Sequence, residues 1–190
     1  MRLGGSVGLL LLCAGFAHAG GGLPVITEVH PAPAAGSAEF IEISNPSAED
    51  VALSGWELSG AVSHVFSGGA RIRAFTSIVL AADPGRFQAA YGFAADGRYS
   101  GTLPGEAGTI TLARRDGGFA CRASWSLEPA SLARNGGASL ELLSPELDGA
   151  TPASWTPSLV LGGTPREENS RRIAHESDPV VPQRDLWRYW

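Results

Sequence analysis

Three glutamates near the start of the chain have the residue type and spacing to do chemistry. Glu28, Glu39 and Glu42 stand on two neighbouring segments that alternate like strands. Paired carboxylates bind calcium or act as a general acid and base. Two of the three would approach each other if the segments pair, yet Glu39 and Glu42, three apart, point to opposite faces of a regular strand. We therefore favour solvent-facing glutamates, or ion pairs with Arg71 and Arg73, over a metal or acid–base site.

The histidines do not form a catalytic or metal-binding set. His30, His64 and His175 are far apart, and none stands at metal-ligand spacing from another His or a Cys. We interpret them as surface or structural residues. A G-x-S-x-G pattern at residues 4–8 lacks the strand and helix that flank a nucleophile. The sequence therefore predicts no catalytic residue, no cofactor and no metal, and it leaves the ligand-binding residues unidentified.

Three tryptophans allow two interpretations. Trp56, Trp125 and Trp155 are spaced along the chain and could form a platform on which sugar rings stack. Tryptophan at regular positions of a sandwich more often fills the core, where its large apolar ring is buried. We favour the core.

The composition excludes several classes of function. The formal net charge of the 190 residues is −5, whereas proteins that bind phosphate backbones need a basic face, so we expect no nucleic-acid partner. The two cysteines exclude a disulfide scaffold and a four-cysteine zinc site.

The first 19 residues have the pattern of a secretory signal peptide. A basic start at Arg2 precedes an apolar run over residues 7–16, and Ala17-His18-Ala19 forms an A-x-A cleavage site. We expect cleavage after Ala19 and a secreted or cell-surface protein. The apolar run is too short to span a membrane, and no later segment is long and apolar enough to do so.

Cleavage at that site would leave a lone cysteine, Cys121. A lone cysteine in an exported protein either bonds a second chain or remains a thiol. We favour a buried free thiol packed among Phe119, Ala120 and Ala123.

Short alternating segments separated by turns predict the elements that position these residues. Residues 24–30 suit an edge strand because Pro24 opens them, and the apolar run 77–81 suits a strand buried on both faces. Asp116-Gly117 marks a hairpin turn. The other strands are expected at residues 39–43, 51–53, 56–58, 64–66, 70–74, 108–113, 119–125 and, as the last, 139–143. About nine short strands with one short helix predict an all-β protein, a β-sandwich.

The one helix is expected to begin after Asp83. The Asp83 side chain can cap free N–H groups, and Pro84 fits the first helical position. Phe87 and Tyr91 lie four residues apart on one face. Gly92 suits the end of the helix, where a positive φ is common.

The chain changes character after about residue 170. Residues 171–190 are polar and contain Pro179 and Pro182, which predicts a linker after a folded domain of residues 20–170. They end in an aromatic run from Leu186 to Trp190. Exposed aromatic clusters are liabilities, so this run either folds back on the sandwich or begins a further module.

Two motifs are specific enough to indicate a family. Glu39 to Pro46 follows E-x-x-E-x-x-N-P, and Leu53 to Trp56 is L-S-G-W. Together they resemble the lamin tail domain (LTD) family in its bacterial secreted form. Supporting motifs lie at residues 25–29, 77–83, 87–92 and 139–141, at Trp155, and at Gly162-Gly163-Thr164-Pro165 with Asn169. Arg166 stands where the closing motif of the family has a glycine, and the resemblance covers about Leu23 to Ser170.

The resemblance implies an immunoglobulin-like β-sandwich. In such a fold Gly55 would make the tight turn before Trp56, Trp56 would anchor the core, and Asn45 would bond the backbone of its own turn. The family uses none of these as a catalytic residue. Its bacterial members are similar to accessory modules joined to secreted hydrolases, nucleases, phosphoesterases or spore-coat-type kinases. Trp187-Arg188-Tyr189 looks like a segment that opens the next module in such proteins.

The favoured function is a non-enzymatic binding or scaffolding module outside the cell or on its surface, whose partner is an unknown extracellular protein or polysaccharide. The alternative is the N-terminal accessory domain of a larger secreted hydrolase, phosphoesterase or spore-coat-type kinase, whose catalytic part lies beyond Trp190. A third hypothesis is a calcium-dependent adhesin that uses Glu28, Glu39 or Glu42.

Overall fold

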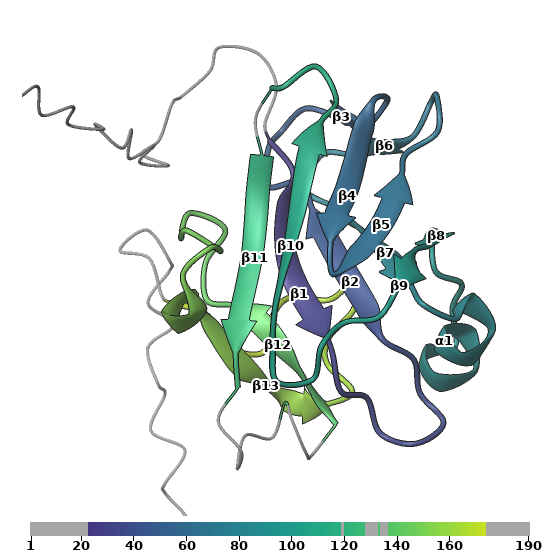
Figure 1. Ribbon diagram of the computed structural model, residues 1–190, viewed down its shortest axis with the longest axis vertical. Helices are drawn as coiled ribbons and strands as arrows, with labels where there is room; N and C mark the ends of the chain where they lie inside the picture. Colours follow the sequence, from purple (N-terminus) through teal and green to yellow (C-terminus); the bar gives the residue numbers. More distant parts are fainter. Residues whose placement is uncertain (1–22, 119, 128–132, 134–136, 174–190) are drawn as a thin grey trace, which may run out of the picture.

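The computed structural model describes residues 23–118, 120–127, 133 and 137–173. Within these residues the chain forms two facing β-sheets, with a helix beside one end of the sandwich (Figure 1). The expected signal peptide with its cleavage site, Phe119, His175 and the aromatic run at 186–190 lie outside the described residues. These four expectations therefore stay predictions.

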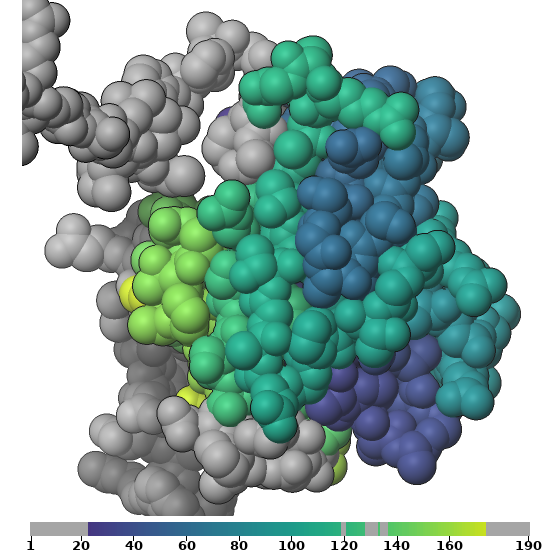
Figure 2. Space-filling model, viewed as in Figure 1, coloured from purple at the N-terminus to yellow at the C-terminus, as the bar shows by residue number. Residues whose placement is uncertain are grey.

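The strands that the structure describes form two large sheets and a small ribbon. The first sheet has the order β13 (Trp155–Leu161), β12 (Ala138–Leu142), β1 (Val25–His30), β2 (Phe40–Ser44), β7 (Ser77–Ala81) and β8 (Gly97–Arg98). The second sheet has the order β11 (Ala120–Ser126), β10 (Ala107–Arg114), β4 (Trp56–Gly60), β5 (Val62–Val65) and β9 (Ser100–Gly101). β3 (Val51–Ala52) pairs with β6 (Arg71–Ile72) in the ribbon. The strand pairs are antiparallel except β7 and β8. Figure 2 shows the outer face of the second sheet, with teal β10 and β11 beside blue β4 and β5.

The all-β, immunoglobulin-like sandwich is confirmed, although the strands are more numerous than expected. The expected strands at 39–43, 77–81 and 108–113 are found, and β10 and β11 form the hairpin predicted at Asp116-Gly117. Most of the additional strands are only two residues long. The prediction that residues 139–143 form the last strand is wrong, because β13 follows and pairs with β12. β13 contains Pro157, which an edge strand tolerates.

The prediction that the first strand lies at an edge is also wrong. β1 lies inside its sheet, between β12 and β2. Pro24 precedes Val25, the first residue of the strand. Its missing N–H therefore removes no ladder hydrogen bond, and the strand can pair on both sides.

The core between the sheets contains all three tryptophans. Trp56, Trp125 and Trp155 are buried among aliphatic side chains of both sheets. The Trp125 Nε1 donates to the Pro104 carbonyl at 3.0 Å, so its one polar atom is satisfied. The core interpretation is confirmed, and a sugar platform made of these rings is wrong.

The helix α1 (Pro84–Tyr91) has the ends that the sequence predicts. The Asp83 Oδ1 accepts from the N–H groups of Gly85 and Arg86, both at 3.0 Å. Gly92 has φ +79° and ends the helix. Phe87 and Tyr91 stack with ring centroids 4.5 Å apart. Phe87 packs on Phe40, Val79 and Ala81, which form a second, smaller core outside the first sheet.

Candidate functional site

Three buried carboxylates stand side by side across the first sheet. Glu28 of β1 is the cross-strand partner of Glu42 on one side and of Glu141 on the other. All three residues are at most 2 % exposed. Glu39 lies apart from this row, and its Oε2 accepts from the Leu103 N–H at 2.9 Å. The structure therefore brings together two of the three predicted glutamates and adds Glu141, which sequence reasoning used only as part of a family motif.

Residues 163–171, the closing segment, cover this row and supply its hydrogen-bond donors. The Thr164 N–H donates to Glu28 Oε1 at 2.9 Å, and the Thr164 hydroxyl donates to Glu141 Oε1 at 2.9 Å. The Arg166 N–H donates to Glu42 Oε2 at 2.6 Å. Each of the three carboxylates thus accepts a hydrogen bond from the closing segment. These bonds fix the closing segment to the sheet.

Further bonds complete the attachment at both ends of the row. The Ser170 hydroxyl and the Arg171 N–H donate to Glu141 Oε2 at 2.8 and 3.0 Å. The Asn169 side chain donates to the Leu142 carbonyl at 2.9 Å. On the other side of the row, the Thr27 hydroxyl donates to Glu42 Oε1 at 2.7 Å.

The expectation that these glutamates face solvent or pair with Arg71 and Arg73 is wrong. Glu28 and Glu42 are buried, and hydroxyl and backbone N–H donors replace water around them. Burying a carboxylate is tolerated only with such partners. The donors of the closing segment are more than 100 residues away in sequence, so local patterning could not reveal them.

Burial dominates the electrostatics of the row. Loss of water raises the pKa of Glu28 to about 8, and the charges of Glu42 and Glu141 add to this rise. The bonds from Ser139 and Thr164 work in the opposite direction. Glu28 Oε2 is buried without a hydrogen-bond partner. A neutral, protonated Glu28 at pH 7 follows from this pKa. Burial also raises the pKa of Glu42.

The hydrogen bonds of the row hold the closing segment on the sheet. The three side chains are buried, and Glu42 also lines a cavity. In the part of the chain that the structure describes, no group of three or more His, Cys, Asp or Glu side chains is placed to hold a metal ion.

The two histidines within the described residues are structural, as predicted. His30 is fully buried, and its Nε2 is 3.0 Å from the Gly137 carbonyl. Burial lowers the pKa of His30 to about 4, so the ring is neutral at pH 7. The His64 Nδ1 lies 2.8 Å from the Arg98 carbonyl.

Cys121 is half-buried, so the expectation that it is buried is wrong. Its Sγ accepts from the Ile26 N–H at 3.3 Å. The side chain packs at the margin of the main core, which also contains Ala123.

A groove of about 910 Å³ opens beside the row, on the outer side of the first sheet. Glu42 and Ser77 line it from the sheet, Arg166 and Asn169 line it from the closing segment, and Phe75 lines it from the β6–β7 turn. We call this feature the Phe75 groove. It is open and large enough for a segment of an extended ligand.

Phe75 is presented to solvent by a strained turn. Phe75 is 72 % exposed, and its backbone φ is +54°. Left-handed backbone is unusual for a bulky residue and persists only where neighbouring bonds enforce it. The Phe75 N–H donates to the Ser47 carbonyl at 3.1 Å, and the Thr76 N–H donates to the Arg73 carbonyl at 3.2 Å.

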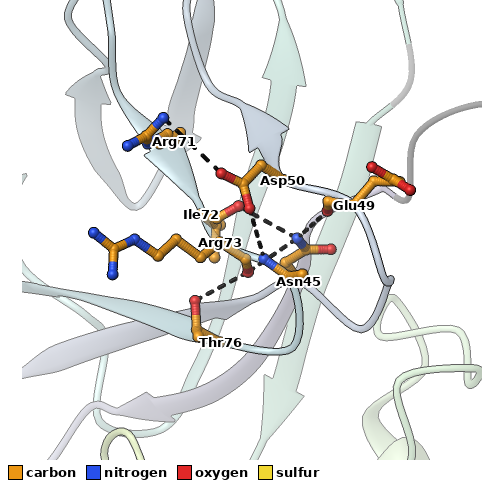
Figure 3. A network of polar contacts seen from close by, with 8 residues as sticks. Asn45, Glu49, Asp50, Arg71, Ile72, Arg73 and Thr76 are labelled. Carbon is orange, nitrogen blue, oxygen red and sulfur yellow. Dashed lines mark hydrogen bonds and ion pairs between the residues drawn. The ribbon is translucent and has the colours of Figure 1, made fainter.

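Asn45 lies beside this turn and bonds its backbone (Figure 3). Its Nδ2 donates to the carbonyls of Glu49, Ile72 and Arg73 at 2.7, 3.3 and 3.1 Å. The expectation that Asn45 bonds the backbone of its own turn is confirmed by the Glu49 bond. The bonds to Ile72 and Arg73 extend its reach to β6 and to the turn that carries Phe75.

Two arginines line the groove together with Phe75. Arg71 and Arg73 line the groove, and the Arg71 guanidinium is 4.0 Å from Asp50. Among the described residues Arg73 has no ion-pair partner. Sequence reasoning missed Phe75 as a site residue, although a phenylalanine in a turn after two alternating arginines was a visible signal.

Arg166 stands where the closing motif of the family has a glycine, and its backbone conformation shows why a glycine suits this position. Arg166 has φ +67°, the conformation that a glycine adopts without strain. Its guanidinium pairs with Asp96 at 2.7 Å and lies 4.9 Å from the centre of the Phe93 ring. Gly55, with φ +79°, makes the turn before the buried Trp56, as the resemblance implies.

Comparison with known proteins identifies the family. The model of the Lamin Tail Domain family matches residues 18–127, more than half of the chain. No curated protein matches the chain. Among the described residues, every helix is too short or too polar to cross a bilayer. The matched region holds the first eleven strands and most of both sheets, and it includes Asn45, Gly55 and Trp56 in the roles described above. The chain therefore belongs to the lamin tail domain family, a family of non-catalytic immunoglobulin-like domains.

Proposed function

We propose that the chain is an exported, non-enzymatic binding module that acts outside the cell or on its surface, with the Phe75 groove as its ligand-binding surface. The observation that carries the binding role is Phe75, a large aromatic residue that is 72 % exposed at positive φ beside the groove. Such strain costs roughly 1–3 kcal/mol and clusters at ligand sites. Because the ring is exposed, its packing contacts offset little of this strain.

The non-enzymatic role is supported by the hydrogen bonds that the buried carboxylates make to the closing segment. Glu28, Glu42 and Glu141 are each bonded to the closing segment, so they serve the fold. Export is supported by the basic start, the apolar run and the A-x-A site of residues 1–19.

The binding role is tested by sedimenting purified protein with insoluble surface material from the cells that produce it. Phe75→Asn removes the ring, and asparagine tolerates left-handed backbone, so the turn is preserved. We expect it to lower the bound fraction about tenfold, whereas Phe75→Tyr retains binding. Leu161→Ala is the matched control, because Leu161 is equally exposed, at 72 %, on the β13 edge. Equal binding by Phe75→Asn and the unchanged protein would refute the groove as the site.

Export and completeness are tested together on the native protein. N-terminal sequencing of the exported form should begin at Gly20, and an unprocessed Met1 would contradict export through this leader. An intact mass larger than the 190 residues explain would favour the alternative function, in which this chain is the accessory domain of a larger secreted enzyme.

A further inference from the structure

The Phe75 groove combines an exposed aromatic ring with two arginines, one in β6 and one directly after it. Arg71 and Arg73 alternate with Ile72, whose side chain is fully buried, so both arginines point away from the core. In Figure 3 both side chains extend to the same side, away from Asn45. Arg71 is only at the limit of ion pairing with Asp50, at 4.0 Å. This pair of guanidinium groups favours a ligand that carries carboxylates or similar anions.

The remaining lining disfavours a densely charged ligand. Asp96 and Glu168, which lie in the same groove, are paired with Arg166 and Arg172, and Glu167 adds a further carboxylate that would repel closely spaced anions. Carboxylate oxygens accept hydrogen bonds from sugar hydroxyls, and so can the hydroxyl oxygens of Ser44 and Ser77, whose own protons are donated to Glu42. A ligand with many hydroxyls and widely spaced carboxylates therefore fits better than a polyphosphate or a nucleic acid.

We propose that the Phe75 groove binds a carboxylated polysaccharide. One face of a sugar ring packs on Phe75, and the uronate carboxylates of the chain pair with Arg71 and Arg73. This inference rests on the function proposed above and specifies its ligand class.

An acidic polypeptide fits the groove less well. Polypeptide partners are anchored by side chains that enter desolvated pockets, whereas Phe75 projects outward and offers a flat face. The C–H groups on one side of a sugar ring pack on such a face without needing a pocket. Arg73, exposed beside the ring, is in place to meet a carboxylate on that sugar or its neighbour.

The test measures binding of the full chain to defined polymers by titration calorimetry. Polygalacturonate and hyaluronan carry uronate carboxylates, and fully methyl-esterified polygalacturonate keeps the rings without the charge. We expect binding to the first two, weakened by added salt because ion pairs are screened, and at least tenfold weaker binding to the ester. Poly-glutamate represents an acidic polypeptide and should bind at least tenfold more weakly than polygalacturonate.

Three variants test the assigned residues. Arg73→Gln and Phe75→Asn should each weaken binding to polygalacturonate about tenfold. Arg98→Gln is the matched control, since it removes the same charge from an exposed arginine outside the groove. It should change the affinity less than twofold. Equal losses in Arg73→Gln and Arg98→Gln would overturn the assignment of Arg73.

Other outcomes would overturn the ligand class while leaving the proposed function intact. Loss of sedimentation with cell-surface material in Phe75→Asn, but no binding to either uronate polymer, would reject the polysaccharide. Preferential binding of poly-glutamate would make the partner an acidic polypeptide. A dimer that Phe75→Asn dissociates would make the occupant a second copy of this chain. Uronate binding that appears only in Trp187→Ala would make the occupant the C-terminal aromatic run.

Discussion

Phe75 and Arg166, the non-glycine residues with positive φ among those described, use their side chains differently. Such backbone costs about 1–3 kcal/mol for an ordinary residue. Arg166 offsets this through its ion pair with Asp96 and its contact with Phe93. Phe75 is largely exposed, so its ring recovers little. Contacts within the fold therefore offset the strain at Arg166, whereas the strain at Phe75 is offset little by contacts of its ring.

Phe75→Gly should make the protein more stable and less able to bind. Glycine adopts the φ of +54° without steric cost, and the gain is about 1 kcal/mol after its greater freedom in the unfolded chain is counted. Urea unfolding measures the gain, and the sedimentation assay measures the loss. A destabilised Phe75→Gly would show that the ring supports the fold.

Two substitutions of Arg166 should distinguish the free-energy cost of its strained backbone from the contribution of its side-chain contacts. Arg166→Ala loses the Asp96 and Phe93 contacts and keeps the strain, whereas Arg166→Gly loses the contacts and relieves it. Both keep the N–H that donates to Glu42. We expect Arg166→Gly to be about 1 kcal/mol more stable than Arg166→Ala, measured by urea unfolding. Equal stabilities would mean that the left-handed backbone costs nothing here.

At the scale of elements, Asn45 links the end of β2 to β6 and to the turn that carries Phe75. Neither β3 nor β6 is long enough to stand alone, since each contributes two residues to the ribbon. The ribbon therefore depends on the side-chain bonds of Asn45 to hold its turn.

Asn45→Ala should destabilise the protein by about 1–3 kcal/mol. It removes the side-chain donor of the buried Ile72 carbonyl, whereas the Arg73 carbonyl keeps its bonds from the Thr76 N–H and hydroxyl. Ser47→Ala is the control, since it removes one hydroxyl and keeps the Ser47 N–H bond to Asn45. Thermal unfolding of both variants measures the difference. Equal effects would show that the Asn45 amide is not the group that holds the ribbon.

Elements set by local chemistry were predictable from the sequence. The helix α1 depends on Asp83, Pro84 and Gly92, which act within a few residues of its ends. Asp116-Gly117 fixes the β10–β11 hairpin in the same way. The motif positions Asn45 and Gly55 also lie within local turns, so the family pattern assigned their roles.

Elements set by distant partners were not predictable. β13 contains Pro157, and only its pairing with β12 makes it a strand. Pro24 suggested an edge, yet β12, more than 100 residues later, pairs with the strand that follows it. The burial of Glu28 depends on Thr164, 136 residues away. Hydrophobic periodicity depends only on residues close together in sequence, so it could not predict these long-range pairings.

At the scale of the whole molecule, two buried groups shape stability in opposite directions. Glu28 has a folded pKa of about 8, above its ordinary 4.5, so its contribution is complete below pH 4.5 and is lost as the pH rises through 8. His30 has a folded pKa of about 4, below its ordinary 6.5, so its contribution is complete above pH 6.5 and is lost as the pH falls through 4. Glu39 and Glu42, whose pKa values burial also raises, act in the direction of Glu28.

The free energy of unfolding should therefore fall between pH 6.5 and 8. The opposing slope from His30 fades above pH 6.5, and Glu28 supplies up to about 1.4 kcal/mol per pH unit, so the net fall over the interval is roughly 1–2 kcal/mol. Urea unfolding at both pH values measures the fall. Glu28→Gln, which cannot ionise, should flatten the slope, whereas Glu146→Gln on the surface should not. A stability that rises over this interval would contradict a buried, neutral Glu28.

The position of β1 inside the first sheet determines when that sheet can form during folding. The first strand to emerge from a ribosome or a secretion channel pairs with β12, and its Glu28 is bonded by Thr164, near the end of the described chain. Contacts so distant in sequence form late and slowly. The first sheet therefore cannot be completed until β12 and the closing segment have been delivered. A chain cut short of residue 164 would keep three carboxylates without their closing donors and would remain a substrate for proteases.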